Sequence, residues 1–403
     1  MTRTFLFICL LGYMQATALF ASGISDIGNI TNIKVYNGKL YAAGSKGIAE
    51  LSSATEAKWT IVLPEIGVRM IEVNNEAIAY TGYDFAGIDR SKNILLSNLG
   101  DKLTISKTLA GMIDLSGKAL WEVTLDTKER ISPPAIGKDI LAMNAASQLI
   151  VLSRKDGKVM QMTSNCTAVG PTSGMISQSM PNQPLIYNDA IYSTGFCKLM
   201  KTDLGGKEVS SSKYFALMKP FEGLTTPPLL FNDQIIFGNC ASGADVPSKV
   251  FSTNAEMKDD LWTDFHDKQS AVGSLATNGE VVVALSNYLM RGYNKKGKDI
   301  WENDEIGLPG FRGVRYVGAS FGTRTSHGNL LCVDDKYVYT TGYIKPKKKN
   351  TTANSNVTII DVATGKLVKV IESPNMVDAI DMQVMGTDIL LVVPDGILKL
   401  SSL

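Results

Sequence analysis

The chain has 403 residues, of which 44% are hydrophobic and 20% are charged, an ordinary composition for a folded protein with a large core. Its 40 basic and 39 acidic residues give a formal net charge of +1. Such a balance provides no long-range attraction to nucleic acid or to anionic lipid, so we expect neither as a partner.

The first 21 residues have the pattern of a secretory signal peptide. Arg3 provides a short basic region, and an apolar stretch follows from Phe5 to Met14. Ala16-Thr17-Ala18 and Leu19-Phe20-Ala21 each fit a cleavage site. The alternative is a membrane anchor, but this stretch is too short to cross a bilayer of about 30 Å.

No later stretch of the chain has the length and apolar character of a transmembrane helix. We therefore expect residues 1–21 to be removed and residues 22–403 to form a single domain. The sequence places this domain in the periplasm or outside the cell, without a lipid anchor.

Four cysteines follow the predicted cleavage site: Cys166, Cys197, Cys240 and Cys332. In an oxidising compartment they can form up to two disulfides, in any of three connectivities. Buried free thiols are the equal alternative. None of the four belongs to a C-x-x-C pair, so the sequence does not support a zinc finger, a thioredoxin-like motif or haem attachment.

A hairpin phrase recurs along the chain: an apolar segment, a turn with Asn, Asp or Gly, and an alternating strand. VYNGKLYAAG, IYNDAIYSTG and LFNDQIIFGN are clear copies. Repetition of this kind is typical of solenoids and propellers. The eight copies start near Val35, Val73, Ala135, Ile186, Leu230, Ala276, Val333 and Val384.

A second hairpin phrase follows each of the first seven copies, and its turn ends in Gly-Lys or a similar pair. A tight turn of this kind needs a positive φ, which favours glycine. The glycines at this position are Gly117, Gly157, Gly206, Gly297 and Gly365.

The tryptophans of the chain all fall just after this second turn. A large flat side chain that recurs in an outer strand suits packing between neighbouring sheets. The four residues are Trp59, Trp121, Trp262 and Trp301.

Two hairpins per copy make a four-stranded antiparallel sheet, which cannot bury both of its faces alone. The copies must therefore stack, and radial stacking also protects the strand edges. No long stretch has apolar residues at helical spacing with caps. The sequence thus predicts an all-β protein, an eight-bladed β-propeller of four-stranded antiparallel blades.

The second phrase resembles the PQQ-type repeat, D-x-x-T-G-K-x-x-W followed by paired prolines. Asp361–Lys366 matches it without the tryptophan and Asp114–Lys118 matches with it, while Pro133-Pro134 and Pro227-Pro228 open the next units. The resemblance covers nearly the whole chain after residue 21. This family includes quinoprotein dehydrogenases and also BamB-like, non-enzymatic components of outer-membrane assembly. It therefore implies either PQQ-dependent oxidation with calcium or a scaffold for cell-envelope proteins.

Two departures weigh against the oxidoreductase. Alcohol-oxidising quinoproteins have adjacent cysteines that stack on the quinone, and this chain has no Cys-Cys pair. No set of Glu, Asn and Asp residues matches their calcium ligands. The chain also lacks a G-x-S-x-G motif and a phosphate-binding loop, and two histidines exclude a three-histidine metal site. We expect no metal, no cofactor and no catalytic residues.

The eighth copy ends at Leu403 without a fourth strand, which would leave a sheet edge exposed. The available donor is the predicted mature N-terminus, near Ser22–Asn29. We expect this segment to pair outside the last strand, close the ring and give a monomeric propeller.

Four segments interrupt the repeat, near residues 84–108, 166–182, 307–329 and 345–356. Loops carry function more often than the scaffold that holds them. The third segment is a candidate surface for an anionic or peptide ligand, and a solvated inter-blade loop is the alternative. Its candidate residues are Arg312, Arg315, Tyr316, Arg324 and His327.

Three functions follow as hypotheses. The first is a non-catalytic exported scaffold for protein interaction, with outer-membrane protein assembly as its most concrete form. The second is a PQQ-dependent or related oxidoreductase. The third is a secreted module that binds a carbohydrate or a small anion through the arginines of the third segment. We prefer the first because the repeat is complete and reactive residues are scarce.

Overall fold

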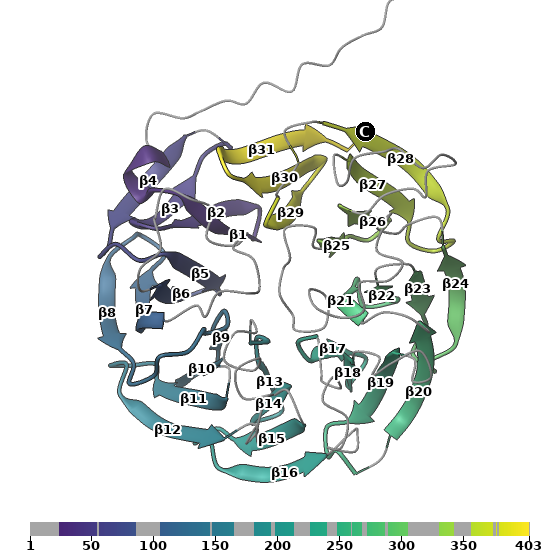
Figure 1. Cartoon of the computed structure of the whole chain (residues 1–403), viewed down its shortest axis with the longest axis horizontal. Helices are drawn as coiled ribbons and strands as arrows, with labels where there is room; N and C mark the ends of the chain where they lie inside the picture. The colour runs from purple at the N-terminus through teal and green to yellow at the C-terminus, as the bar shows by residue number, and fades with distance from the viewer. Residues whose placement is uncertain are drawn as a thin grey trace, which may run out of the picture.

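The computed structural model describes residues 24–54, 56–85, 105–145, 147–164, 181–194, 198–212, 226–239, 248–258, 260–267, 272–286, 289–304, 330–341, 356–373, 376 and 379–402. These residues form eight antiparallel sheets arranged in a ring (Figure 1). Seven sheets have four strands and the last has three. The predicted all-β, eight-bladed propeller is therefore confirmed.

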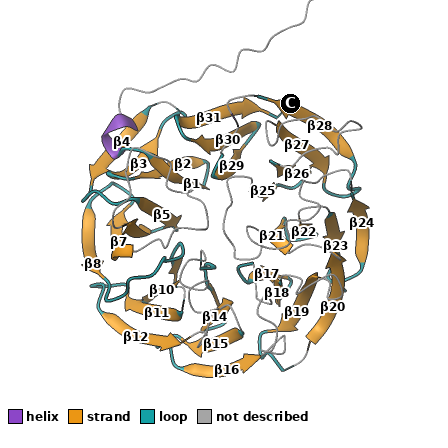
Figure 2. Cartoon of the chain, in the orientation of Figure 1, coloured by secondary structure: helices purple, strands orange, loops and turns teal. Residues whose placement is uncertain are grey.

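Consecutive strands are neighbours within every sheet, and the chain runs outward from the ring axis in each blade (Figure 1). Outside the strands, the longest regular element of the described chain is the short 3-10 helix η1 (Ile24–Ile27), drawn in purple in Figure 2. The innermost strands are β1 (Ile30–Tyr36), β5 (Val68–Val73), β9 (Ala135–Ile136), β13 (Leu185–Tyr187), β17 (Leu229–Phe231), β21 (Val272–Thr277), β25 (Leu331–Val333) and β29 (Asp381–Met385).

The second strands are β2 (Lys39–Gly44), β6 (Ala77–Phe85), β10 (Ile140–Asn144), β14 (Ala190–Thr194), β18 (Gln234–Gly238), β22 (Val282–Ser286), β26 (Tyr337–Thr340) and β30 (Asp388–Val393). The third strands are β3 (Gly47–Leu51), β7 (Ile105–Asp114), β11 (Gln148–Ser153), β15 (Leu199–Asp203), β19 (Ser248–Asn254), β23 (Met290–Tyr293), β27 (Asn356–Asp361) and β31 (Gly396–Ser401). The fourth strands are β4 (Ala57–Val62), β8 (Ala119–Thr124), β12 (Val159–Ser164), β16 (Glu208–Ser212), β20 (Asp260–Asp267), β24 (Asp299–Asn303) and β28 (Leu367–Glu372).

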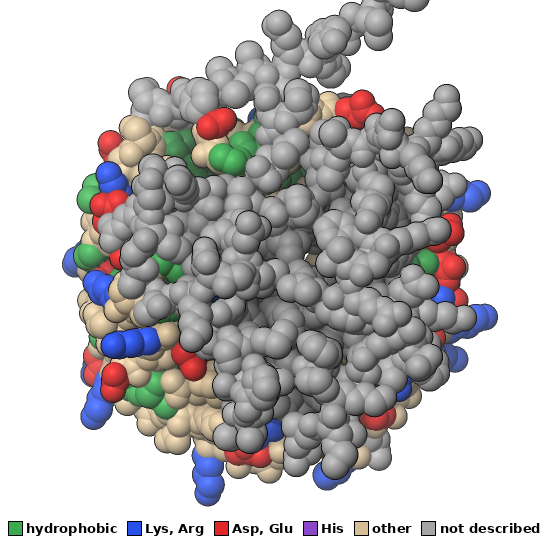
Figure 3. All heavy atoms as spheres, viewed as in Figure 1, with side chains coloured by type: hydrophobic (Ala, Val, Ile, Leu, Met, Phe, Trp, Pro, Cys, Tyr) green, Lys and Arg blue, Asp and Glu red, His purple; other side chains and the backbone are tan. Residues whose placement is uncertain are grey.

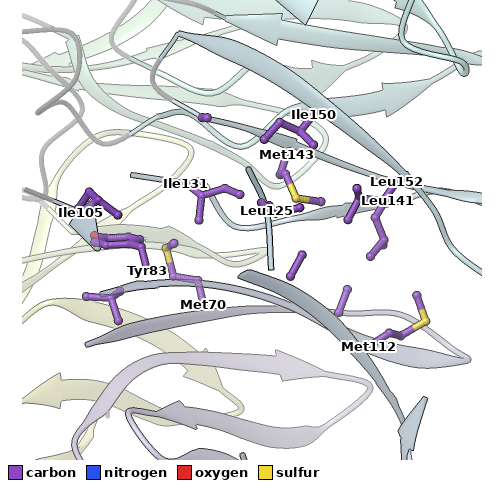
Figure 4. Packing of buried hydrophobic residues seen from close by; sticks show 14 of the residues in the cluster. Met70, Tyr83, Ile105, Met112, Leu125, Ile131, Leu141, Met143, Ile150 and Leu152 are labelled. Atoms are coloured by element: carbon purple, nitrogen blue, oxygen red, sulfur yellow. The ribbon is translucent and has the colours of Figure 1, made fainter. Parts of the chain in front are cut away.

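The hydrophobic core lies in the seams between blades. The second and third strands are almost wholly buried because apolar residues alternate onto both of their faces, and each face meets another blade. Figure 4 shows one seam, where Met70 and Met112 of blade two meet Leu141 and Ile150 of blade three. The described residues contain eight such clusters, and each is shared by two adjacent blades.

The four tryptophans lie in fourth strands, and each packs on a turn glycine of the next blade. A Cβ atom on Gly365, for example, would lie 2.6 Å from the indole ring of Trp301. Glycine satisfies two demands here, because its φ is +68° and the ring leaves no room for a side chain. The remaining pairs are Trp59 on Gly117, Trp121 on Gly157 and Trp262 on Gly297, while Gln161 takes the tryptophan position over Gly206.

Each fourth strand has a β-bulge beside the tryptophan position, where the register with the third strand shifts. A bulge twists the outer strand and protects its free edge. The residue skipped in the register is Lys58 in the first blade and an exposed apolar residue in the next six. These six residues are Leu120, Met160, Val209, Leu261, Ile300 and Val368.

Aspartates close the tight turns before the glycines. In the last of these turns, Asp361 Oδ1 accepts hydrogen bonds from the backbone N–H of Thr364 at 2.8 Å and from its hydroxyl at 2.7 Å. The hydroxyl bond lowers the pKa of the Asp361 carboxyl. The same arrangement around Ser116 lowers the pKa of Asp114. The repeated Asp therefore fixes the turn that presents glycine to the neighbouring blade.

The closing strand that the sequence predicts near Ser22–Asn29 differs from the structure. Residues 22 and 23 lie outside the described residues, and Ile24–Ile27 forms η1 instead of a strand. Ile27 is fully buried in the seam of blades one and eight, and its carbonyl accepts from Lys46 N at 2.7 Å. Gly28, with φ +72°, then turns the chain into β1, so this segment covers blade one rather than extending blade eight.

Direct contact between the first and last blades closes the described ring. Asn32 Nδ2 donates to Asp381 Oδ2 at 2.5 Å, and the same oxygen accepts from Ile33 N at 3.0 Å. Asn32 Oδ1 accepts from Ile71 N of blade two at 2.9 Å. One buried amide therefore links three consecutive blades, and replacing it removes the acceptor of Ile71 N and one of the two donors to Asp381 Oδ2.

The Gly365→Ala variant is expected to lose more stability than Gly386→Ala. The two positions have similar φ values, +68° and +61°, so the backbone strain is alike. Only Gly365 lies against an indole, while nothing is within 4 Å of a Cβ on Gly386. Urea unfolding should give a difference of about 1–3 kcal/mol between the variants. Equal losses would contradict the importance of the Trp301 contact.

The Asn32→Asp variant should lower the free energy of unfolding by about 3 kcal/mol, because it buries a second carboxylate against Asp381 and removes the amide donor. Asn278→Asp is the matched control. Its Oδ1 accepts from two backbone N–H groups of a surface turn, a role that a carboxylate keeps. Chemical denaturation at neutral pH measures both, and similar midpoints would exclude this role for Asn32.

Candidate interaction face and axial network

The antiparallel order of the strands gives the ring two different faces. Turns between first and second strands, and between third and fourth strands, share the turn face. They are tight, with positive φ at residues such as Asn37, Asn188 and Asn232. The connection face receives all other links. The six longest sequence stretches between described strands all join strand ends there: 86–104, 125–134, 165–184, 213–228, 304–330 and 341–355.

The described side chains around the ring carry both signs of charge. Figure 3 shows Lys and Arg interspersed with Asp and Glu around the rim, without a large region of one sign. This agrees with the balanced composition. Recognition at the described rim therefore depends on local groups rather than on a long-range field.

The ligand-binding residues predicted from the sequence all lie in the stretch 305–329, between β24 and β25. This stretch is outside the described residues, so its binding role stays a prediction. The topology assigns its two flanking strand ends to the connection face. The residues concerned are Arg312, Arg315, Tyr316, Arg324 and His327.

Three of the four cysteines, Cys166, Cys197 and Cys240, also lie outside the described residues. Cys332 is half-buried in β25, and its Sγ donates to the backbone oxygen of Met382 in blade eight at 3.0 Å. The disulfide pattern therefore stays a prediction, while Cys332 links the inner strands of two blades.

A polar network on and just before the inner strands joins four blades, and we call it the axial network. Lys34 Nζ of blade one lies 2.8 Å from Glu72 Oε2 of blade two. Gln183 Nε2 of blade four donates to the same oxygen at 2.8 Å and to Pro134 O of blade three at 2.8 Å. Gln183 thus bonds to blade two past the inner strand of blade three, β9, which has only two residues. The side chains of Lys34 and Glu72 are about one quarter exposed.

A second charged group, Arg69, lies fully buried between blades one and two. Its Nη1 donates to Gly44 O at 2.7 Å, its Nη2 donates to Pro64 O at 2.8 Å, and the guanidinium lies 5.6 Å from the Tyr80 ring centroid. Burial lowers the pKa of Arg69 and raises that of Tyr80, whose hydroxyl donates to Glu122 at 2.9 Å. Arg69 therefore joins blade two to blade one and to the linker between them.

The axial network offers a carboxylate, an ammonium and an amide, which are groups that position polar partners. Its four residues contain no thiol or hydroxyl that would act as a nucleophile. Among the described residues, no group of three or more His, Cys, Asp or Glu is arranged to hold a metal ion. In the same part of the chain, no helix is long and apolar enough to span a membrane.

Sequence reasoning missed the axial network and Arg69. A signal was present, since Arg69 and Glu72 are charged residues inside the short strand phrase VRMIEV. The partners of these residues come from other repeats, 111 positions away for Glu72 and Gln183. Periodicity alone does not pair them.

Comparison by sequence finds no matching family model and no matching curated protein. Comparison by structure finds many propellers. The crystal structure of BamB from Moraxella catarrhalis is similar over 92% of this chain and 92% of its own, with a TM-score of 0.59 and 14% identity. The likeness shows the fold.

Two other solved structures extend the comparison. The computationally designed Ika8 protein matches with a TM-score of 0.61 and 12% identity, over 95% of this chain and 98% of its own. Hsv2 of Kluyveromyces lactis matches with a TM-score of 0.50 and 9% identity, over 86% of this chain and 99% of its own. At such identities the common ground is the propeller architecture.

A double-mutant cycle should detect the axial network. Glu72→Ala and Gln183→Ala each remove one side of a bond that shields a half-buried carboxylate, so their effects on unfolding free energy should couple by about 0.5–1 kcal/mol. The control cycle combines Gln183→Ala with Glu208→Ala, whose partner is Lys198 at 2.8 Å. That cycle should be additive. Additivity in both would show that the network contributes nothing measurable.

Proposed function

We propose that this protein is a PQQ-type repeat propeller that acts as a non-catalytic scaffold for protein interaction. The observation that carries the proposal is the asymmetry of the ring. Tight turns close one face, while every long connection between described strands joins the other. Segments of this kind, held by a rigid scaffold, are typical binding elements.

The turn geometry supports the repeat assignment. Asp361 to Lys366 closes a tight turn with glycine at positive φ, and tryptophans from neighbouring blades pack on four such glycines. This is the position at which the sequence resembles PQQ-type repeats. The proposal includes no cofactor, because the sequence lacks the adjacent cysteines of the alcohol-oxidising quinoproteins.

We place the mature scaffold outside the cytoplasm, in the periplasm or secreted, on the strength of the leader pattern in residues 1–21. Its partners are then proteins of the cell envelope. The assembly role implied by the repeat resemblance is the most concrete form of this function. Binding of anions by the arginines of 305–329 stays a hypothesis within it.

Cross-linking to partners tests the proposal. The mature chain should recover an envelope protein from extract, and a lysine-reactive cross-linker should join that partner through connection-face lysines such as Lys46, Lys107 and Lys249. Turn-face lysines, such as Lys118 and Lys298, serve as the internal control because they are exposed to the same reagent. Links found only on the turn face, or no recovered partner, would contradict the proposed face.

A further inference from the structure

The eighth blade has an outer edge that differs from all the others. In the described part of the chain, β31 pairs with β30 and with no second strand, whereas the other seven sheets each have a fourth strand. Its pairing with β30 runs over six residue pairs without a register shift. The bulge that protects the rim of every other blade is therefore missing beside this edge.

The hydrogen-bond pattern shows which backbone groups face this edge. Ser402 N donates to Thr387 O at 2.8 Å, which fixes the alternation along the strand. Gly396, Leu398 and Leu400 then bond to β30. Ile397 and Lys399 alternate with these residues, so their backbone N–H and C=O groups point away from β30.

Apolar side chains line this edge on both sides. Leu398 and Leu400 pack in the seam with blade seven, and Ile397 packs in the seam with blade one. Half-buried Ile371 of β28 and Ala57 of β4 belong to these same seams, one on each side. An extended segment placed between them would continue both apolar faces of the blade.

Two lysines flank the edge. Lys369 stands at the tryptophan position of β28, and its Nζ donates to Ser402 O at 3.3 Å. Lys399 is in β31 itself, with its side chain 53% exposed and its Nζ 2.7 Å from Asp388 Oδ2. Each ammonium has further N–H groups to donate, so the edge favours an incoming segment with carboxylates.

We propose that the outer edge of β31 binds an extended, acidic segment of a partner protein, which adds to blade eight as its fourth strand. Backbone bonds to Ile397 and Lys399 give the affinity, and apolar residues alternating with acidic ones give the specificity. A second copy of this chain fits less well, because pairing two such edges brings their lysines together. This site lies on the rim and does not depend on the connection face.

The test uses a short fluorescein-labelled peptide of alternating valine and glutamate, titrated with the full chain and followed by anisotropy. Wild type should bind it saturably, and a peptide with lysine in place of glutamate should bind at least about tenfold more weakly. Peptide N-methylated at alternate residues should lose binding by a similar factor, because it cannot donate to the edge. This comparison leaves the protein unaltered.

Lys399→Pro and Lys399→Ala form the matched pair of variants. Proline removes the outward N–H, which an edge strand tolerates, whereas alanine keeps it. Lys399→Pro should abolish binding, and Lys399→Ala should weaken it only severalfold, with similar circular dichroism and thermal midpoints for both.

Four results would overturn the proposal. The first is a wild type that does not bind the acidic peptide, and the second is binding that neither N-methylation nor Lys399→Pro weakens. A concentration-dependent dimer that Lys399→Pro abolishes would assign the edge to a second copy. Binding gained only when residues 1–23 are removed would assign it to the chain's own N-terminal segment. The peptide titration tests only the β31 edge, and the cross-linking experiment tests only the connection face. Each of the two proposals can therefore fail without the other.

Discussion

Apolar contact between neighbouring blades is the interaction on which the rest of the structure depends. Every core cluster of the described residues is shared by two adjacent blades. A blade therefore gains its stability from its neighbours, as in other repeat architectures. The polar groups follow this rule as well, because Asn32, Arg69 and Gln183 each bond to a blade other than their own or to the linker before it.

The fold was predictable because its constraints recur at fixed places in the sequence. Gly365 has a positive φ and lies against the indole ring of Trp301, so the turn needs glycine for two reasons. A glycine at this turn position and a tryptophan in the preceding blade therefore recur along the chain. The copies that break the pattern are informative in hindsight. At two tryptophan positions, Gln161 packs on Gly206 and Lys369 donates a hydrogen bond to Ser402 O. The sequence alone shows only that the aromatic residue is missing there.

The candidate site was much less predictable. The bond between Glu72 and Gln183 joins residues 111 positions apart in blades two and four, so no local pattern of the sequence contains both partners. The closing strand near Ser22–Asn29 was wrong for a similar reason. Burial of Ile27 in a seam and the turn at Gly28 decide the path of this segment, and both involve residues distant in sequence. The arginines of 305–329 lie outside the described residues, so their predicted role in binding stays a prediction.

The contact of Asn32 with Asp381 joins residues 349 positions apart. During synthesis the first blade therefore emerges long before the eighth blade exists. Until then, the first blade and the last blade made so far each have one apolar face that no neighbour covers. Contacts so distant along the chain slow folding and prolong exposure to aggregation. The same closure makes the starting point of the ring arbitrary in physical terms. A circular permutant that joins the present termini and begins at a tight turn would retain all eight seams, whereas deleting any one blade would leave two of them open.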